Sequence, residues 1–233
     1  MQTVTSLITG LAMGITILVG QKIGEKRPEQ AGDVIGSGIC LFGVLAAVLT
    51  VLMILGAGFL AGLMHAPDEA FSQTVDYIRI CSAGAVFIIA YNVLGSIFRG
   101  IGDSRMPLFT VAASCVLNIG GDLLLVAGFH MGAAGAALAP VAAQAASVLL
   151  SLAVIRRRTL PFTIGKKNLR FERRLVGRIL ALGTPIALQD LLVSISFLVI
   201  LAIVNSMGVI ASAGVGVAEK LCAFIMLVAS AYM

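Results

Sequence analysis

The sequence contains, at residues 106–128, the stretch MPLFTVAASCVLNIGGDLLLVAG, in which Asp122 is the one charged side chain. A run of this length matches the roughly 20 apolar residues that a helix needs to cross the hydrocarbon core of a bilayer. Lipid offers the backbone no hydrogen-bond partners, so a continuous apolar run favours a helix over a barrel strand. The stretch therefore predicts a transmembrane helix that carries a carboxyl group.

The rest of the chain has the same character. Of its 233 residues 59% are hydrophobic and 12% charged, whereas a soluble domain carries about 25% charged residues. The four cysteines lie in apolar stretches without a CxxC pair, so neither a metal site nor a disulfide framework is indicated. Charged loops separate seven apolar segments, which predict an all-α integral membrane protein with seven transmembrane helices: 3–21, 34–64, 78–98, 106–128, 132–155, 179–205 and 208–233.

The basic residues indicate how these helices are oriented. Of the 16 Lys and Arg residues, 14 follow the first, third and fifth segments, and the alternate loops are acidic, neutral or very short. Loops that are rich in Lys and Arg face the cytoplasm. Membrane orientation therefore explains the net charge of +5, and nucleic-acid binding is not expected. The first helix then runs inward from outside, and we expect a further helix, encoded upstream, to precede it.

Four short motifs occur in order along the chain: GQKIG at 20–24, FRGIGDSRMPL at 98–108, GAAGAALA at 132–139 and GTP at 183–185. Together they resemble the multidrug and toxic compound extrusion (MATE) family. The resemblance implies a transporter of two six-helix bundles, of which this chain supplies helices two to eight. The bundle lacking its first helix would occupy 1–158, a cytoplasmic linker 159–178, and the first two helices of the second bundle 179–233.

Asn118 and Asp122 are the strongest candidates for a cation site. A carboxylate inside a membrane helix costs about 2.5–3.5 kcal/mol and rarely faces lipid. Asp122 lies about 24 Å along the helix from Met106, and Asn118, four residues earlier, shares its face. Such a pair suits Na⁺ or exchangeable H⁺. The alternative is hydrogen bonding to neighbouring helices. The resemblance implies an N-lobe cation site formed by this pair, with Pro140 where some members have a threonine ligand.

Further polar residues in apolar segments are candidates for a substrate site. Tyr91, Asn92 and Gln144 are expected to line a cavity, and Gln189 with Asp190, near mid-membrane, to contact a cationic substrate. The alternative for each is hydrogen bonding between helices. Glu219 and Lys220 either pair with other helices or line the cavity, and the sequence leaves their role open.

The combined interpretation is a cation-coupled antiporter, driven by Na⁺ or H⁺, that exports drugs or amphipathic organic cations across the plasma membrane, the bacterial inner membrane. The alternatives are a lipid-linked sugar flippase of the same superfamily and a nonfunctional truncated remnant. No set of catalytic residues or phosphate-binding loop is present, so an enzyme is not expected. We expect no cofactor beyond the coupling ion, the lipid bilayer and a small-molecule substrate as partners, and a monomer at full length.

Overall fold

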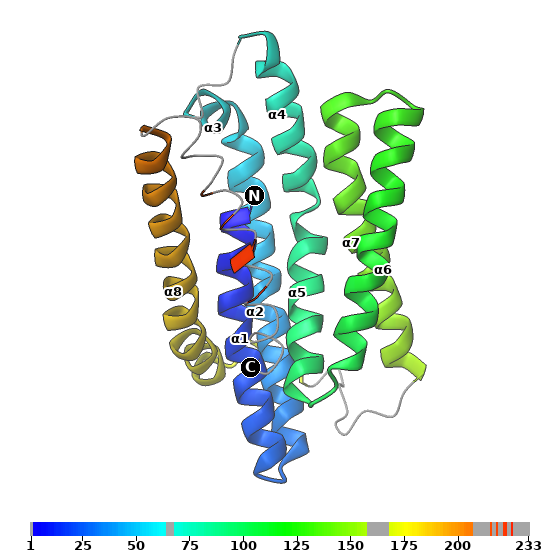
Figure 1. The fold of residues 1–233 in the computed structure, drawn as a ribbon. Helices are drawn as coiled ribbons and strands as arrows, with labels where there is room; N and C mark the ends of the chain where they lie inside the picture. Colours follow the sequence, from blue (N-terminus) through cyan, green and yellow to red (C-terminus); the bar gives the residue numbers. More distant parts are fainter. Residues whose placement is uncertain are drawn as a thin grey trace. The chain divides into compact units, whose positions relative to one another are not determined.

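Helices make up nearly all of the described chain in a computed structural model, which describes residues 2–63, 68–157 and 168–206 and the single positions 215, 218, 221, 222 and 225. Figure 1 shows their arrangement. In order, the helices are α1 (Gln2–Gly24), α2 (Pro28–Leu55), α3 (Ala57–Leu63), α4 (Asp68–Ala83), α5 (Ala85–Gly100), α6 (Arg105–Asp122), η1 (Leu123–Gly128), α7 (Gly132–Arg157) and α8 (Arg173–Ser206).

The predicted all-α membrane architecture is confirmed over the described residues. Five helical stretches are long and apolar enough to cross a membrane, and the bent pair α4–α5 makes a sixth candidate. They are Thr5–Gly24, Pro28–Leu55, Arg105–Gly128, Gly132–Arg157 and Arg173–Phe197. The predicted segment 208–233 lies outside the described residues apart from five single positions, and so do Glu219 and Lys220.

Three predicted segments were placed with wrong boundaries, and the sixth of the seven begins at Arg173 rather than residue 179. The second begins at Pro28 rather than residue 34, because proline suits the first turn of a helix, and it is interrupted at Gly56. The third begins at Asp68 rather than residue 78. It bends by 44° at Gly84, where any side chain would run into Val141 of α7. Charged residues in the first turns of α4 had hidden its start from a search for apolar runs.

The main hydrophobic core forms where α1, α2 and α5 meet. Ala12, Ile15 and Val19 are fully buried on one face of α1, spaced as neighbours on a helix. They belong to one hydrophobic cluster with residues of α2 and α5. In addition, the Thr16 hydroxyl donates to the backbone oxygen of Ser96 at 3.0 Å. These contacts fix the relative positions of the three helices.

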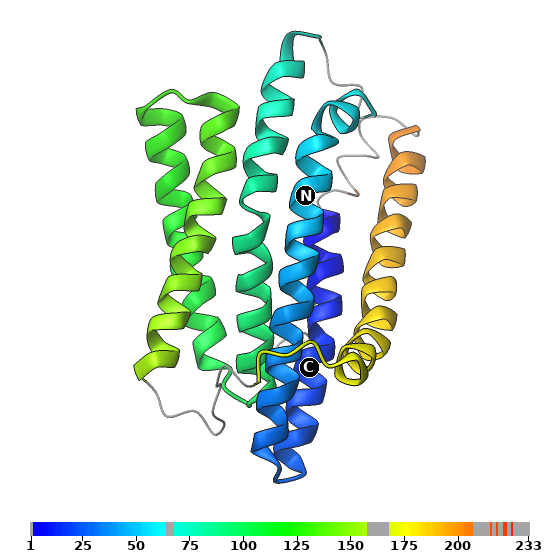
Figure 2. The same cartoon turned by 180° about the vertical axis from the view of Figure 1, so that it is seen from behind.

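The helices α6 and α7 form a hairpin that packs against α4 and α5, as both views show (Figures 1 and 2). The Ser147 hydroxyl of α7 donates to the backbone oxygen of Thr110 in α6 at 3.2 Å, and both side chains are buried. Much of the remaining α6 surface is apolar and exposed, including Leu108, Phe109 and Val116, as a lipid-facing helix requires. The hairpin thus contributes one wall of the bundle.

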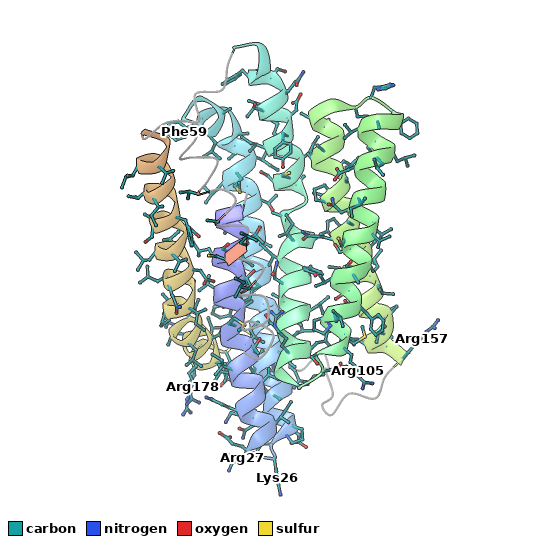
Figure 3. The ribbon with its side chains drawn as sticks, in the orientation of Figure 1. Lys26, Arg27, Phe59, Arg105, Arg157 and Arg178 are labelled. Carbon is teal, nitrogen blue, oxygen red and sulfur yellow. The ribbon has the colours of Figure 1, made fainter. Side chains whose placement is uncertain are left out.

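Basic side chains gather at one end of the bundle, where Figure 3 shows Lys26, Arg27, Arg105, Arg157 and Arg178. Phe59 lies at the opposite end. This separation is what the positive-inside rule requires of a cytoplasmic face. We therefore call this the inner end of the bundle and the opposite end the outer end.

The connection between α1 and α2 at the inner end contains an ion pair. The Lys22 ammonium lies 2.8 Å from a carboxylate oxygen of Glu25, whose side chain is 48% exposed. The hydrogen bond from Lys22 holds the pKa of Glu25 below its ordinary value of 4.5. A lowered pKa in the folded state adds stability above the unfolded-state pKa, and this stability is lost as the pH falls through the folded-state pKa.

We expect a Lys22→Ala variant to return the pKa of Glu25 toward 4.5, because its main hydrogen-bond donor is removed. Thermal stability at neutral pH should hardly change, since exposed ion pairs contribute little. Carbon-detected NMR titration of the labelled glutamate carboxyl in detergent micelles measures the first quantity. An unchanged pKa of Glu25 in the variant would show that Lys22 does not cause the lowering of that pKa.

The chain divides into two compact units, Met1–Leu188 and Gln189–Met233. The boundary falls within α8, three residues after Pro185. The inner half of α8 therefore belongs to the first unit, where Ile179 is fully buried in the hydrophobic cluster with Ile15 and Ile35.

Candidate functional site

A polar cavity of about 260 Å³ lies among α5, α6 and α7. It brings together four residues that the sequence analysis selected, which are Tyr91, Asn118, Pro140 and Gln144. Three further residues of α6 complete its lining, namely Val111, Ser114 and Cys115. Polar groups from three different helices thus converge on one space within the membrane-spanning part of the bundle.

The geometry of α6 explains its contribution to the cavity. Val111, Ser114 and Asn118 are spaced by three and four residues, so they form a stripe along one face of the helix. The sequence analysis selected Asn118 and missed Ser114. The spacing indicates it, because Ser114 lies about one turn before Asn118 on the same stripe.

The helix α7 presents Pro140 and Gln144 to the same cavity, one turn apart. The side-chain oxygen of Gln144 is buried and has no hydrogen-bond partner among the described residues. Pro140 has no N–H, so the backbone oxygen of Ala136 lacks its usual helical donor. A buried acceptor without a partner costs about 1–3 kcal/mol. A cation or a hydrogen-bond donor in the cavity would remove that cost.

Asp122 occupies the last position of α6, one turn beyond Asn118 toward the outer end. Its side chain is partly buried. The π-helical segment η1 begins at the next residue, and such segments often occur at functional sites. Asp122 thus borders the cavity side of α6 without being among the cavity-lining residues.

Asn92 takes part in a different contact. Its side-chain oxygen accepts a hydrogen bond from the Thr9 hydroxyl of α1 at 2.9 Å. Its side-chain nitrogen donates to the backbone oxygen of Ile88 at 2.8 Å. The Asn92 amide therefore joins α5 to α1, the arrangement expected of a polar residue that links helices.

Gln189 and Asp190 belong to the second compact unit. Gln189 is exposed and Asp190 is partly buried. The Ser194 hydroxyl donates to the backbone oxygen of Asp190 at 2.8 Å within α8. The carboxyl group of Asp190 remains a candidate contact for a cationic substrate.

A second cavity, of about 230 Å³, lies among α2, α5 and α7 and is lined by apolar residues only. Phe42, Ile89 and Val148 are among them. It offers no group that could orient a charged ligand. The cavity lined by Asn118 and Gln144 is therefore the better candidate site.

The donors around the polar cavity are of the type that binds hard cations. Asn118 and Gln144 each supply an amide oxygen to the cavity lining, and that of Gln144 has no hydrogen-bond partner among the described residues. Asp122 supplies a carboxylate at the border of the cavity. Oxygen ligands suit Na⁺ and protons rather than soft transition metals. Within the described part of the chain, no three His, Cys, Asp or Glu residues cluster as a transition-metal site would require.

A bundle of membrane-spanning helices with a polar cavity between them is an architecture that membrane transporters use. A search against family models matches residues 1–124, more than half of the chain, to the MatE family. The chain belongs to this family, and the resemblance inferred from the sequence motifs is confirmed. Five apolar helices and bacterial relatives assign it as a multi-pass protein of the bacterial inner membrane.

Known proteins of this family align with almost the whole chain. The "Probable multidrug resistance protein YoeA" of Bacillus subtilis (strain 168) is 29% identical over 229 residues, which cover 95% of this chain and 50% of the relative. Two solved structures are described as the inward-facing and outward-facing conformations of a multidrug resistance MATE family transporter of the MOP superfamily. Their TM-scores are 0.80 and 0.83, each at 26% identity.

The alignment with the inward-facing structure covers 91% of this chain, and the alignment with the outward-facing structure covers 97%. Each alignment covers 50% of the solved chain. The chain thus spans about half the length of the relatives that it matches.

Proposed function

We propose that the transporter containing this chain exports amphipathic organic cations in exchange for Na⁺ or H⁺, and that the coupling ion binds near Asp122 and Asn118. The observation that carries the proposal is the convergence of Asn118, Pro140 and Gln144 on one cavity, with an unpaired buried oxygen on Gln144. The names of the relatives support export of drugs as the activity.

The coupling follows from unequal binding to two states. Binding of the cation near Asp122 from the outer side would change the packing of α6 and α7 and release a bound organic cation. The discharged state would then reopen toward the inner side. An ion can drive such a cycle only if its affinity differs between the two states of the transporter.

The organisation proposed for the whole transporter is a first bundle ending near residue 158, a linker at 159–178 and a second bundle from residue 179. In this proposal the whole transporter acts as a monomer. Tyr91 and Gln144 would contact the substrate from the first bundle, and Gln189 and Asp190 from the second. Pro140 would contribute the backbone oxygen that it frees at Ala136, in place of a side-chain hydroxyl.

Dye efflux tests the proposal. The complete reading frame containing this chain is expressed in an efflux-deficient host, and extrusion of a fluorescent cationic dye is measured while Na⁺ and pH gradients are varied separately. We expect efflux that collapses with one gradient and persists without the other, which identifies the coupling ion. The host carrying empty vector is the control.

Two results would contradict the proposal. Efflux that depends on ATP but on neither gradient would rule out ion coupling. No efflux of any cationic dye, from a protein shown by immunoblot to be in the membrane, would remove the organic-cation substrate class.

A further inference from the structure

Residues 168–172 lie across the inner half of α2. Figure 2 shows this yellow segment crossing the blue helix before it joins α8. The Asn168 side-chain nitrogen donates to a carboxylate oxygen of Asp33 at 2.8 Å. The Ser37 hydroxyl donates to the backbone oxygen of Arg170 at 3.0 Å. Asp33 and Ser37 are four residues apart, so both face the segment from one side of α2.

Gly36 lies between these two hydrogen bonds and allows the segment to approach the helix backbone. A Cβ atom at this position would collide with the backbone oxygen of Asn168. The obstacle is main chain rather than the flexible end of a side chain, so even alanine would displace the segment. Gly36 and Ser37 are both buried. Together, Asp33, Gly36 and Ser37 form a groove on α2 that fits this segment.

The segment ends where α8 begins. The Glu172 N–H donates to the backbone oxygen of Arg170 at 3.0 Å, and the Val176 N–H donates to that of Glu172 at 2.9 Å. The oxygen of Arg170 thus accepts from both Ser37 and Glu172, as a carbonyl with two lone pairs can. The position of the segment on α2 consequently determines where the first turn of α8 starts.

Beyond that turn, the inner half of α8 packs closely on α1. A Cβ at Gly14 would collide with the backbone oxygen of Ile179. A Cβ at Gly10 would lie 2.6 Å from the Cα of Ala187. The inner half of α8 is therefore attached at two places, to α2 through the segment and to α1 through glycine contacts.

We propose that Asp33, Gly36 and Ser37 are positioning residues that dock residues 168–172 on α2 and thereby hold the inner half of α8 against α1. The consequence for transport rests on the function proposed above. Separation of α8 from α1 at the inner end would open the cytoplasmic side of the transporter. The docked segment stabilises the packed arrangement of α8 on α1, so its release shifts the population toward the separated one.

Amide hydrogen exchange on the 233-residue chain in lipid nanodiscs tests the docking. We expect exchange at residues 168–172 to become about fivefold to tenfold faster in Ser37→Ala and in Asp33→Ala, the effect of losing one hydrogen bond. Asp33→Asn keeps an acceptor oxygen for Asn168 and should restore slow exchange. The matched control is Ser82→Ala, which also removes a buried hydroxyl but one that bonds within its own helix, to Ile78.

The position of α8 is measured separately in the same chain, by electron–electron distance measurements between spin labels on exposed residues. Cysteines at Gln30 of α2 and Gly177 of α8, in a background without native cysteines, carry the labels. Gly36→Ala should shift the distances to longer and broader values, whereas Ser82→Ala should not. Unchanged exchange in Ser37→Ala and Asp33→Ala, or unchanged distances in Gly36→Ala, would overturn the proposal.

Neither readout depends on transport activity. Failure of the dye-efflux assay would contradict the proposed function and leave these results intact. Failure of the exchange and distance experiments would contradict the docking and leave the efflux result intact.

Discussion

Replacement of Asp122 by asparagine in the complete reading frame is expected to abolish gradient-driven efflux, down to the level of the empty vector. The amide keeps the size and one oxygen of the side chain but can neither carry the negative charge nor exchange a proton at neutral pH. Asp122 lies one turn from Asn118 and borders the candidate cavity. Dye efflux under the effective gradient is the measurement, with membrane expression checked by immunoblot.

The matched control for Asp122→Asn is Glu29→Gln. It neutralises an exposed carboxylate in the first turn of α2, far from the cavity, and should leave efflux near that of the unmodified protein. Asp122→Glu, which preserves the charge, should retain partial activity. Normal efflux in Asp122→Asn would exclude this carboxylate as the coupling site.

Gly14→Ala is expected to lower the free energy of unfolding by about 1–3 kcal/mol, because the added methyl group overpacks a backbone contact. The Cβ would collide with the backbone oxygen of Ile179 and lie 3.2 Å from the backbone nitrogen of Gly183. Neither atom can rotate away as a side chain could. Thermal unfolding of the 233-residue chain in detergent, followed by circular dichroism, measures the effect.

Gly24→Ala provides the control on the same helix, because nothing lies within 4 Å of a Cβ at that position. Alanine is also the better helix former, so this variant should be as stable as the parent or slightly more so. Equal stability of Gly14→Ala and Gly24→Ala would mean that α8 does not pack on α1 as closely as the structure indicates.

The sequence predicted most of the spanning helices because apolar length is nearly sufficient to define them. The segments 106–128 and 132–155 correspond closely to Arg105–Gly128 and Gly132–Arg157. The prediction was wrong where a helix is amphipathic or broken. The helix α4 begins with Asp68 and contains Asp76 and Arg79, so hydropathy alone placed its start ten residues too late.

The candidate site was predictable in part for a similar reason. Polar residues in apolar helices are costly and few, so Asn118 and Gln144 stood out, whereas Pro140 was selected through the family resemblance; the structure brings the three together. Asn92 is adjacent to Tyr91 in sequence, and consecutive helical residues point about 100° apart. The two therefore face different neighbours, and only Tyr91 lines the cavity.

The docking of residues 168–172 on α2 had no signal in the sequence. The hydrogen bond between Asp33 and Asn168 joins positions 135 residues apart. Asp33 and Asn168 are ordinary residues for a helix end and a loop. Gly36 is one of 26 glycines, and its special role depends on a backbone oxygen that only the folded chain brings near.

The wide turn η1, which follows Asp122 directly, affects how this part of the chain tolerates changes in length. A π-helical turn spans one residue more than an α-helical turn, so Leu123–Gly128 accommodates an extra residue between α6 and α7. Deletion of one residue there would leave an ordinary α-helical turn and preserve the register of both flanking helices. A single-residue deletion beside the carboxylate would therefore leave the cavity-lining stripe of α6 in place.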